Sequence, residues 1–476
     1  MADEQIAFAS IAEIGLLFRR RKLSPVELTR SLLERIAKIN PALNAYLTVS
    51  DETALQQASQ AEAELLAKTR GKKRDRGALH GIPISLKDNI YTKDIRTTGG
   101  SKILKEFVPL HDAPVVKALK NAGAIILGKT NMHEFAYGVT TDNPHFGPTR
   151  NPWDRERIPG GSSGGSAAAL AAGLCYGSIG TDTGGSIRIP ASLCGVVGIK
   201  PGLGRVSADD VIPLSPTLDF VGPLARTVED VALMLEPIFI RGQKERKLLP
   251  GRTVSSRARR PCLGIPKEFF LDILDPEVKA AFQSALQLLK KRGAKLKDVS
   301  FPELYASEDA GNQIAWAEAT LYHLEAGWFP GQAEGYSEDV RGRLEMGAKV
   351  TAVDYLRARA SREKFKSAFL KVFGANDLDA LVVPTTPIPA PRIGEKSALI
   401  NGIAHSIRAL LLRLCRPANL AGVPAISVPS GLTRQGLPIG LQFITEWTDE
   451  PFLFEIARDF ERAHPLSVRP QLQSLD

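Results

Sequence analysis

Short runs rich in Ile and Val alternate with glycine-rich turns between residues 80 and 230, and this alternation constrains the fold more than any other feature. The runs have the length and composition of buried strands. An alanine-rich segment, Ser166 to Gly173, has the composition of a tightly packed helix. Strands and helices that alternate along a chain favour an α/β fold in which helices cover the faces of a central sheet. We therefore predict such a sheet for this part of the chain.

Two amphipathic helices are predicted before this region. Ser10 and Glu13 fit a capping box, as do Ser24 and Glu27, and each box leads into apolar residues at helical spacing. Pro25 stands at the first helical position of the second box, where the missing N–H of proline is not needed. We therefore expect the fold to open with two helices.

Strand-like runs bounded by Pro and Gly return near the C-terminus, at residues 378–387, 422–429 and 438–443. Their short length and apolar composition match those of the runs between residues 80 and 230. We expect them to rejoin the first sheet, so that residues 378–445 return to the core.

The middle of the chain, residues 240–375, carries little chemical signal. A short strand at 262–265 precedes a helix at 276–291, and mostly charged helical sequence follows. We interpret this segment as an insertion or cover. The prediction is one domain over residues 1–476, with its core at 80–230.

Composition bounds the class of protein. The 476-residue chain is 43% hydrophobic, which is enough to bury a large core. No run approaches the roughly 18 apolar residues that a membrane span needs, and the first residues lack the basic and apolar parts of a secretory signal. We therefore expect a cytoplasmic protein that does not act at a membrane.

The net charge of +9 at pH 7 is concentrated in two basic stretches, residues 68–76 and 241–260. Both contain Gly or Pro and lack interleaved aromatic residues, which favours solvated loops over patches that bind nucleic acid or lipid. The cysteines are scattered without CxxC spacing, so we expect small buried side chains and no zinc site or disulfide framework. These cysteines are Cys175, Cys194, Cys262 and Cys415.

Two clusters rich in glycine and serine carry most of the chemical signal. Residues 160–166 read Gly-Gly-Ser-Ser-Gly-Gly-Ser, and residues 181–188 read Thr-Asp-Thr-Gly-Gly-Ser-Ile-Arg. Glycine runs let backbone N–H groups converge on one point. The embedded serines supply hydroxyls that can act as a nucleophile or a proton relay once a base is near.

Other interpretations of the first cluster fit the sequence less well. The cluster formally matches the G-x-S-x-G nucleophile elbow, but that elbow must follow a strand, and the proline-bounded stretch 151–159 cannot form one. A phosphate cradle would need a G-x-x-x-x-G-K-[ST] motif and an acidic residue for magnesium. A flexible turn without chemistry is the remaining interpretation.

A base is suggested by Lys87. None of the seven histidines stands in a motif that ties it to a serine. In the stretch 81–89, strand alternation puts Ser85 and Lys87 on the face opposite to the apolar side chains. Burial of a lysine disfavours its ammonium form and can lower its pKa by up to ~3–5 units. Taken alone, Lys87 also fits a lysine that forms a salt bridge or that extends its ammonium to solvent along an apolar surface.

Five motifs in order give the chain a specific resemblance to a known family. They lie at residues 84–88, 128–135, 160–166, 182–188 and 194–201. Together they resemble the amidase signature of the amidase signature family. The resemblance implies a large mixed central sheet covered by helices on both faces.

The resemblance also implies a catalytic triad and its supports, without metal or cofactor. Ser186 would be the nucleophile, Ser162 a bridging serine after a cis peptide, and Lys87 the base. Backbone N–H groups of the second cluster would form an oxyanion hole. The residues implied are Thr183, Gly184, Gly185 and Ser186 for that hole, Ser163, Asp182 and Arg188 as loop supports, and Met132, Tyr137 and Thr385 in the substrate pocket.

The function that the resemblance implies is hydrolysis of a carbonyl C–N bond. An amide, an anilide or a carbamate such as a urethane would be cleaved through an acyl-enzyme on Ser186, with esters as a side activity. The expected partner is that small-molecule substrate, with no nucleic acid and no membrane. The expected assembly is a monomer or homodimer.

Two alternatives stay open. The glutaminase (A) subunit of a tRNA-dependent amidotransferase is similar over the same motifs, although three positions depart from its pattern: His133, the loop 207–211, and Leu411 with Leu412. At the last of these, an acid for the glutamine ammonium is expected. A non-catalytic scaffold that binds anions is the other alternative, against which the presence of Lys87, Ser162 and Ser186 argues.

Overall fold

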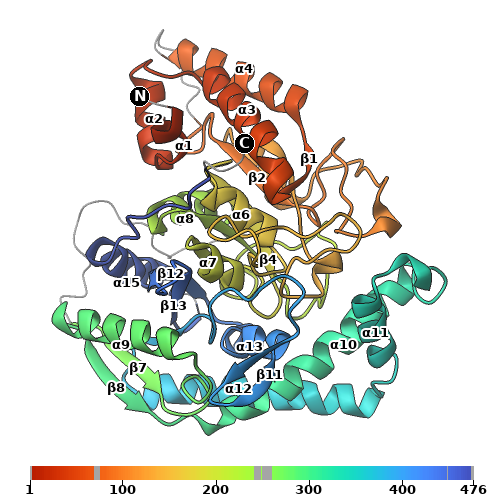
Figure 1. The fold of residues 1–476 in the computed structure, drawn as a ribbon, viewed down its shortest axis with the longest axis vertical. Helices are drawn as coiled ribbons and strands as arrows, with labels where there is room; N and C mark the ends of the chain where they lie inside the picture. Colours follow the sequence, from red (N-terminus) through yellow and green to blue (C-terminus); the bar gives the residue numbers. More distant parts are fainter. Residues whose placement is uncertain (1–2, 69–75, 241–247, 249–259, 448, 473–476) are drawn as a thin grey trace.

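One large sheet organises the molecule (Figure 1). The computed structural model describes residues 3–68, 76–240, 248, 260–447 and 449–472. Within these residues, 11 strands form a sheet in the order β1-β3-β2-β4-β6-β5-β12-β13-β9-β7-β8. The strands are β1 (Tyr46–Val49), β2 (Pro83–Lys87), β3 (Ile125–Thr130), β4 (Gly177–Asp182), β5 (Val197–Lys200), β6 (Phe220–Ala225), β7 (Cys262–Pro266), β8 (Lys295–Val299), β9 (Ala380–Pro384), β12 (Ala425–Leu432) and β13 (Pro438–Ile444).

The sheet is mixed. β2 pairs in parallel with β3 and β4, and β7 pairs in parallel with β8 and β9. The other pairs, from β4 through β6, β5, β12 and β13 to β9, are antiparallel. The C-terminal strands β9, β12 and β13 lie in the same sheet as β2 to β6. Segment 240–375 does more than cover the sheet, since β7 and β8 extend its edge.

Helices cover both faces of the central strands. Side chains at successive strand positions point to opposite faces of a sheet. Gly177 and Gly180 of β4 are three positions apart, so a Cβ at one would lie on the opposite face from a Cβ at the other. A Cβ at Gly180 would lie 2.9 Å from Ser163 Oγ, next to α6 (Gly164–Ala171). A Cβ at Gly177 would lie 2.5 Å from Met234 Sδ of α8 (Val228–Leu235). The predicted fold class, a mixed sheet with helices on both faces, is therefore confirmed.

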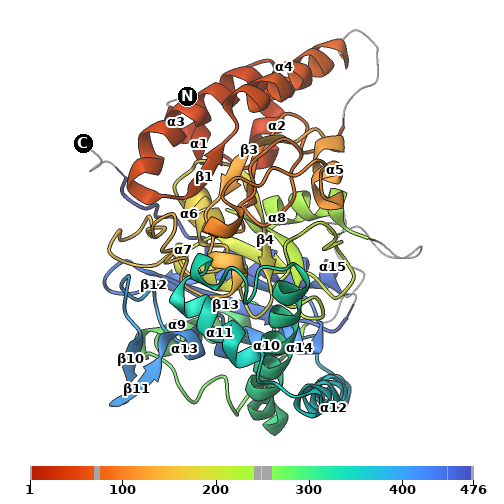
Figure 2. The same cartoon turned by 90° about the vertical axis from the view of Figure 1, so that its right-hand side faces the viewer.

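The N-terminal helices form one end of the molecule, as Figures 1 and 2 show. Both predicted capping boxes are present, because the side chains of Ser10 and Ser24 accept the N–H groups of Glu13 and Glu27. The glutamates in turn accept the backbone N–H groups of the two serines. The helices at this end are α1 (Asp3–Ala7), α2 (Ile11–Arg19), α3 (Pro25–Leu43) and α4 (Asp51–Lys68).

The remaining helices complete the layers and the opposite end of the molecule (Figure 2). Helix α11 (Glu338–Gly347) packs its buried residues Val340 and Leu344 on the loop that carries Phe135 and Tyr137. A separate hairpin of β10 (Ser397–Ile400) and β11 (Ile403–Ser406) precedes α13 (Ile407–Arg413). These helices are α5 (Pro114–Asn121), α7 (Arg188–Cys194), α9 (Pro276–Lys291), α10 (Ser307–Glu325), α11 (Glu338–Gly347), α12 (Ala352–Asn376), α13 (Ile407–Arg413), α14 (Arg416–Ala421) and α15 (Glu450–Ala463).

Composition singles out the basic stretches, the cysteines and the lack of a long apolar run. Most of the two basic stretches, 68–76 and 241–260, lies outside the described residues. The four cysteines carry free thiols, and Cys262 is the most exposed of them, although partly buried. Across the part of the chain that the structure describes, no helix is both long and apolar enough to cross a bilayer.

Candidate active site

Lys87 lies at the carboxyl end of β2 with no solvent-accessible surface. Its Nζ donates to Ser162 Oγ at 2.7 Å and to Thr181 Oγ1 at 2.6 Å. Burial lowers the pKa of Lys87 to about 7, although the charges of Asp219 and Asp182 oppose this shift. A large fraction of Lys87 is therefore neutral near pH 7, where it can accept a proton.

The loop before α6 holds Ser162 in reach of Lys87. The Gly161–Ser162 peptide is cis. Thr141 Oγ1 donates to the carbonyl of Gly160 at 2.8 Å, and the His133 N–H donates to the carbonyl of Ser162 at 3.1 Å. A Cβ at Gly161 would lie 2.7 Å from the backbone nitrogen of Thr140. A side chain at Gly161 would therefore force this loop away from its neighbour.

Ser186 lies in the turn between β4 and α7, beside the first serine loop. The Ser163 N–H donates to the carbonyl of Ser186 at 3.2 Å, which holds the two loops together. Gly185 has a φ of +129°, a value that favours glycine, and its N–H donates to Asp182 Oδ1 at 2.8 Å. Ser186 is 5% exposed and lines a pocket with Gly184. Among the described residues, the Ser186 hydroxyl has no hydrogen-bond partner.

A buried ion pair supports the turn that carries Ser186. Arg188 Nη2 lies 2.9 Å from Asp182 Oδ1, and neither side chain is exposed. Burial by itself would raise the pKa of Asp182, but the charge of Arg188 and hydrogen bonds from Arg188 and Asn419 lower it to about 2. Asp182 also accepts the N–H groups of Gly185 and Ile187. The carboxylate thus ties both ends of the turn to one point.

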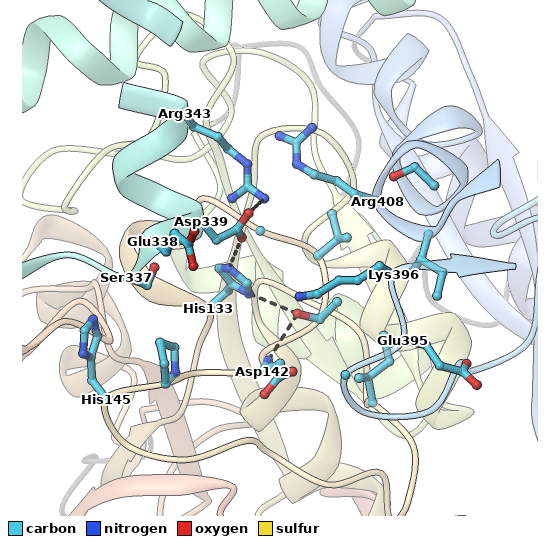
Figure 3. A pocket seen from close by; sticks show the side chains of 18 residues that line it. His133, Asp142, His145, Ser337, Glu338, Asp339, Arg343, Glu395, Lys396 and Arg408 are labelled. Carbon is cyan, nitrogen blue, oxygen red and sulfur yellow. Dashed lines mark hydrogen bonds and ion pairs between the residues drawn. The ribbon is translucent and has the colours of Figure 1, made fainter. Parts of the chain in front are cut away.

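The pocket that holds Ser186 lies beside a larger outer cavity. Tyr137, Arg408, Leu412 and Arg416 line the inner pocket with Ser186. The outer cavity, of about 500 Å³, shares Arg408 with the inner pocket, together with Gly138 and Val139. Figure 3 shows the side chains of His133, Asp339, Arg343, Lys396 and Arg408 around the outer cavity. The two spaces therefore adjoin at Arg408.

The predicted pocket residues have different surroundings. Tyr137 lines the inner pocket, as expected from the resemblance. Met132 is fully buried in a cluster with Phe135 and Tyr336. Thr385 is fully buried and its hydroxyl bonds to Ser427 Oγ at 2.8 Å. Neither Met132 nor Thr385 is among the described residues that line the inner pocket.

Sequence reasoning missed several residues of the site. Thr181 is the second acceptor for Lys87, and Arg408 and Arg416 line the inner pocket. A signal for the arginines exists, because both lie in the mostly apolar stretch 407–421, which also holds Arg413, and charged residues are expensive to bury. The sequence pattern alone does not say toward which space they point.

The comparison with known proteins identifies the family. A family model described as Amidase matches residues 27–454, which is most of the chain. The mixed sheet covered by helices is the fold that the resemblance to this family implies. The chain belongs to the amidase signature family.

Particular relatives cover almost the whole chain. The A subunit of the glutamyl-tRNA(Gln) amidotransferase of Geobacter metallireducens is 39% identical over 483 residues, which span 95% of this chain and 97% of the relative. The A subunit of the same enzyme of Syntrophobacter fumaroxidans is 40% identical over 482 residues, which span 95% of this chain and 96% of the relative.

Solved structures also resemble the chain over nearly its whole length. A crystal structure of an amidase has a TM-score of 0.86 at 35% identity, covering 95% of this chain and 99% of the other. A structure that reports a vestigial protein complex and the origins of an s-triazine catabolic enzyme has a TM-score of 0.87 at 32% identity. It covers 97% of this chain and 100% of the other.

These relatives correct the expected partners. The sequence analysis predicts no nucleic-acid partner and a monomer or homodimer. Both parts of that prediction are wrong, because the curated relatives are by name subunits of a multi-subunit enzyme of glutamyl-tRNA(Gln). The signature motifs surround the reacting groups and carry no information about surfaces that bind partners. The same names favour the alternative, a glutaminase subunit, over the main prediction of a stand-alone amidohydrolase. Both predictions are consistent with the amidase family.

Proposed function

We propose that the chain hydrolyses a carbonyl C–N bond through an acyl-enzyme on Ser186, with Ser162 and Lys87 as the proton relay. The observation that carries this proposal is the 2.7 Å contact between fully buried Lys87 Nζ and Ser162 Oγ, beside the turn of Ser186. Amides, anilides, carbamates including urethanes, and esters all present a carbonyl that this chemistry can attack.

The first half of the proposed reaction breaks the C–N bond. Neutral Lys87 takes a proton from Ser162 as Ser162 takes the proton of Ser186, whose oxygen bonds to the carbonyl carbon. The relay then returns a proton to the leaving nitrogen, which departs as ammonia or an amine. Water, activated by the same relay, attacks the acyl-enzyme and releases the carboxylic acid and free Ser186.

Backbone N–H groups would stabilise the negative oxygen formed in each half. The Gly185 N–H already donates to Asp182, so the proposed donors are the N–H groups of Thr183, Gly184 and Ser186. A fixed donor of this kind is worth about 3–4 kcal/mol in transition-state stabilisation where it has been measured. The ion pair of Asp182 with Arg188 would keep this turn in place.

A substrate panel tests the proposed activity. Purified full-length protein is assayed with primary amides, anilides, carbamates, esters and L-glutamine, and released ammonia, amine or alcohol is measured. Ser186→Ala is expected to lower kcat at least about 10³-fold, because no other group can form the acyl-enzyme. Ser284→Ala, on the exposed face of α9, is the matched control and should leave kcat unchanged. Equal rates for Ser186→Ala and the wild type would overturn the proposal.

A second candidate is the glutaminase subunit of a glutamyl-tRNA(Gln) amidotransferase, which the names of the curated relatives favour. Its substrate, glutamine, carries an ammonium, and the described lining of the inner pocket includes no carboxylate to pair with it. The test combines the full chain with the remaining subunits of such an enzyme, glutamine and glutamyl-tRNA(Gln). Formation of glutaminyl-tRNA(Gln) that depends on Ser186 would support this candidate, and its absence would exclude it.

A further inference from the structure

Positive charge gathers where the outer cavity meets the inner pocket. Arg408, in the first turn of α13, lines both spaces, and Arg416, which begins α14, lines the inner pocket with Ser186. Arg343 of α11 extends toward Arg408 across the outer cavity (Figure 3). Three guanidinium groups from separate helices therefore line these two adjoining spaces.

The three arginines differ in how well their charges are neutralised. Arg343 forms an ion pair with Asp339, so its charge has a partner. Arg416 Nη1 donates to two uncharged oxygens, the Glu308 carbonyl at 3.3 Å and Asn312 Oδ1 at 2.7 Å. Arg408 forms no ion pair to any carboxylate of the described residues. The inner arginines therefore form no ion pair among the described residues, although the charge of Asp339 acts on Arg408 and that of Glu308 on Arg416.

Two buried polar atoms at this junction also lack partners. Within the described residues, neither Arg408 Nε nor Tyr137 Oη has a hydrogen-bond partner, although both atoms are buried. Tyr137 is 1% exposed and lines the inner pocket beside Arg408. An unsatisfied buried donor costs about 1–3 kcal/mol, so a ligand that offers acceptors would be stabilised here.

The electrostatics of the junction point in the same direction. Burial lowers the pKa of Arg408 to about 9, and the nearby charges of Arg343 and Arg416 contribute to this shift. Burial likewise lowers the pKa of Arg416 to about 10. These shifts mean that both cations are held at an energetic cost, which a bound anion would relieve. Leu412 and Arg416 both lie next to Gly184, and Leu412 contributes no opposing charge there.

We propose that the substrate carries a carboxylate, separate from the scissile carbonyl, which binds Arg408 and Arg416 and accepts the hydroxyl of Tyr137. This inference rests on the proposed function and narrows its substrate to an anionic amide without an ammonium group, such as the monoamide of a dicarboxylic acid. Arginine suits this role because its fork of N–H groups matches the two oxygens of a carboxylate.

Paired substrates test the inference on the full-length protein. Monoamides of succinic, glutaric and adipic acids are compared with neutral alkyl amides of the same chain length, and glutaramate is compared with L-glutamine. We expect kcat/KM to favour the best monoamide over its neutral counterpart by about 10- to 100-fold, the range of a charge-assisted hydrogen-bonded contact. Glutaramate should also exceed L-glutamine, whose ammonium finds no carboxylate among the described residues of the inner pocket.

Variants assign the preference to Arg408. Arg408→Gln should lower the ratio of kcat/KM for charged over neutral amide about 10- to 100-fold, while turnover of the neutral amide shows that the protein is folded. Arg408→Lys should restore part of the ratio, since it keeps the charge. Arg341→Gln removes a partly exposed arginine of the same helix as Arg343 and should leave the ratio unchanged. Glutarate should raise Tm in the wild type and not in Arg408→Gln.

The outcomes separate this inference from the proposed function. Cleavage of neutral and anionic amides at equal kcat/KM, or an unchanged ratio in Arg408→Gln, would overturn the carboxylate site and leave Ser186 chemistry in place. A preference for L-glutamine over glutaramate would also overturn it. Failure to cleave any amide would overturn the proposed function itself.

Discussion

Lys87 Nζ donates to Ser162 Oγ across 2.7 Å, and neither side chain has solvent-accessible surface. The pair joins the end of β2 to the loop before α6, so the base and the relay come from separate parts of the chain. Burial explains both the lowered pKa of the lysine and its exclusion from competing water contacts. The first predictions follow from this pair.

The rate of amide hydrolysis should rise with pH through a midpoint near 7. Burial lowers the pKa of Lys87 to about 7, and only the neutral amine accepts a proton, so the active fraction grows above that pH. The measurement is the pH dependence of kcat/KM for a neutral amide between about pH 5 and 9, which spans the titration. A rate that falls as pH rises through this range would contradict Lys87 as the base.

Lys87→Ala should reduce amide cleavage more than cleavage of an ester of the same acid. An amine leaves only after it is protonated, whereas an alkoxide leaves more readily, so losing the relay harms the amide more. We expect the ratio of amide to ester kcat to fall at least about tenfold, within the range of general acid–base contributions. Equal losses on both substrates would argue against a relay through Ser162.

The stability of the protein should depend on pH through Lys87. Its pKa is about 7 in the folded protein and 10.5 for an ordinary lysine side chain, so the unfolded state binds more protons between these values. Stability of the wild type therefore gains from a rise in pH across this window, and below pH 7 the full penalty remains. Lys87→Met lacks this group. Its free energy of unfolding relative to wild type should decrease as pH rises from about 7 to about 10, as measured by urea denaturation.

Breaking the buried ion pair between Asp182 and Arg188, which supports the turn of Ser186, should destabilise the fold. Arg188→Met leaves Asp182 ionised and buried, which costs about 3–5 kcal/mol in free energy of unfolding. Adding Asp182→Asn should recover part of this loss, because the uncompensated charge is removed. Arg292→Met, which breaks an exposed pair with Asp459, is the control and should change stability little. A similar small effect for Arg188→Met would contradict the structural role of the pair.

Part of the fold could be predicted because its signals are local. The capping boxes of α2 and α3, the apolar strands near the site and the alternation that places Lys87 on one face of β2 all depend on neighbours in sequence. Strand β8, Lys-Leu-Lys-Asp-Val, was beyond this reasoning, since a charged edge strand carries no apolar run and is recognised through its pairing with β7.

The candidate site likewise combines residues that local sequence predicts with residues that only the packing of distant segments places. Lys87, Ser162 and Ser186 each lie in a short motif of consecutive residues. These motifs predict which residue types come together in the site. The directions of Arg408 and Arg416 depend on how α13 and α14 pack, and more than 200 residues of chain separate both arginines from Ser186. The prediction of no nucleic-acid partner rests on the composition of two basic stretches, 68–76 and 241–260, and composition does not locate a partner surface elsewhere in the fold.

Covalent labelling tests directly whether Ser186 is the nucleophile. Full-length protein is treated with a fluorophosphonate, digested, and analysed by peptide mass spectrometry for the modified residue. We predict one covalent adduct on the peptide that contains Ser186, lost in Ser186→Ala and greatly slowed in Lys87→Ala. No adduct on wild-type protein, or an adduct on Ser162 with Ser186 unmodified, would contradict it.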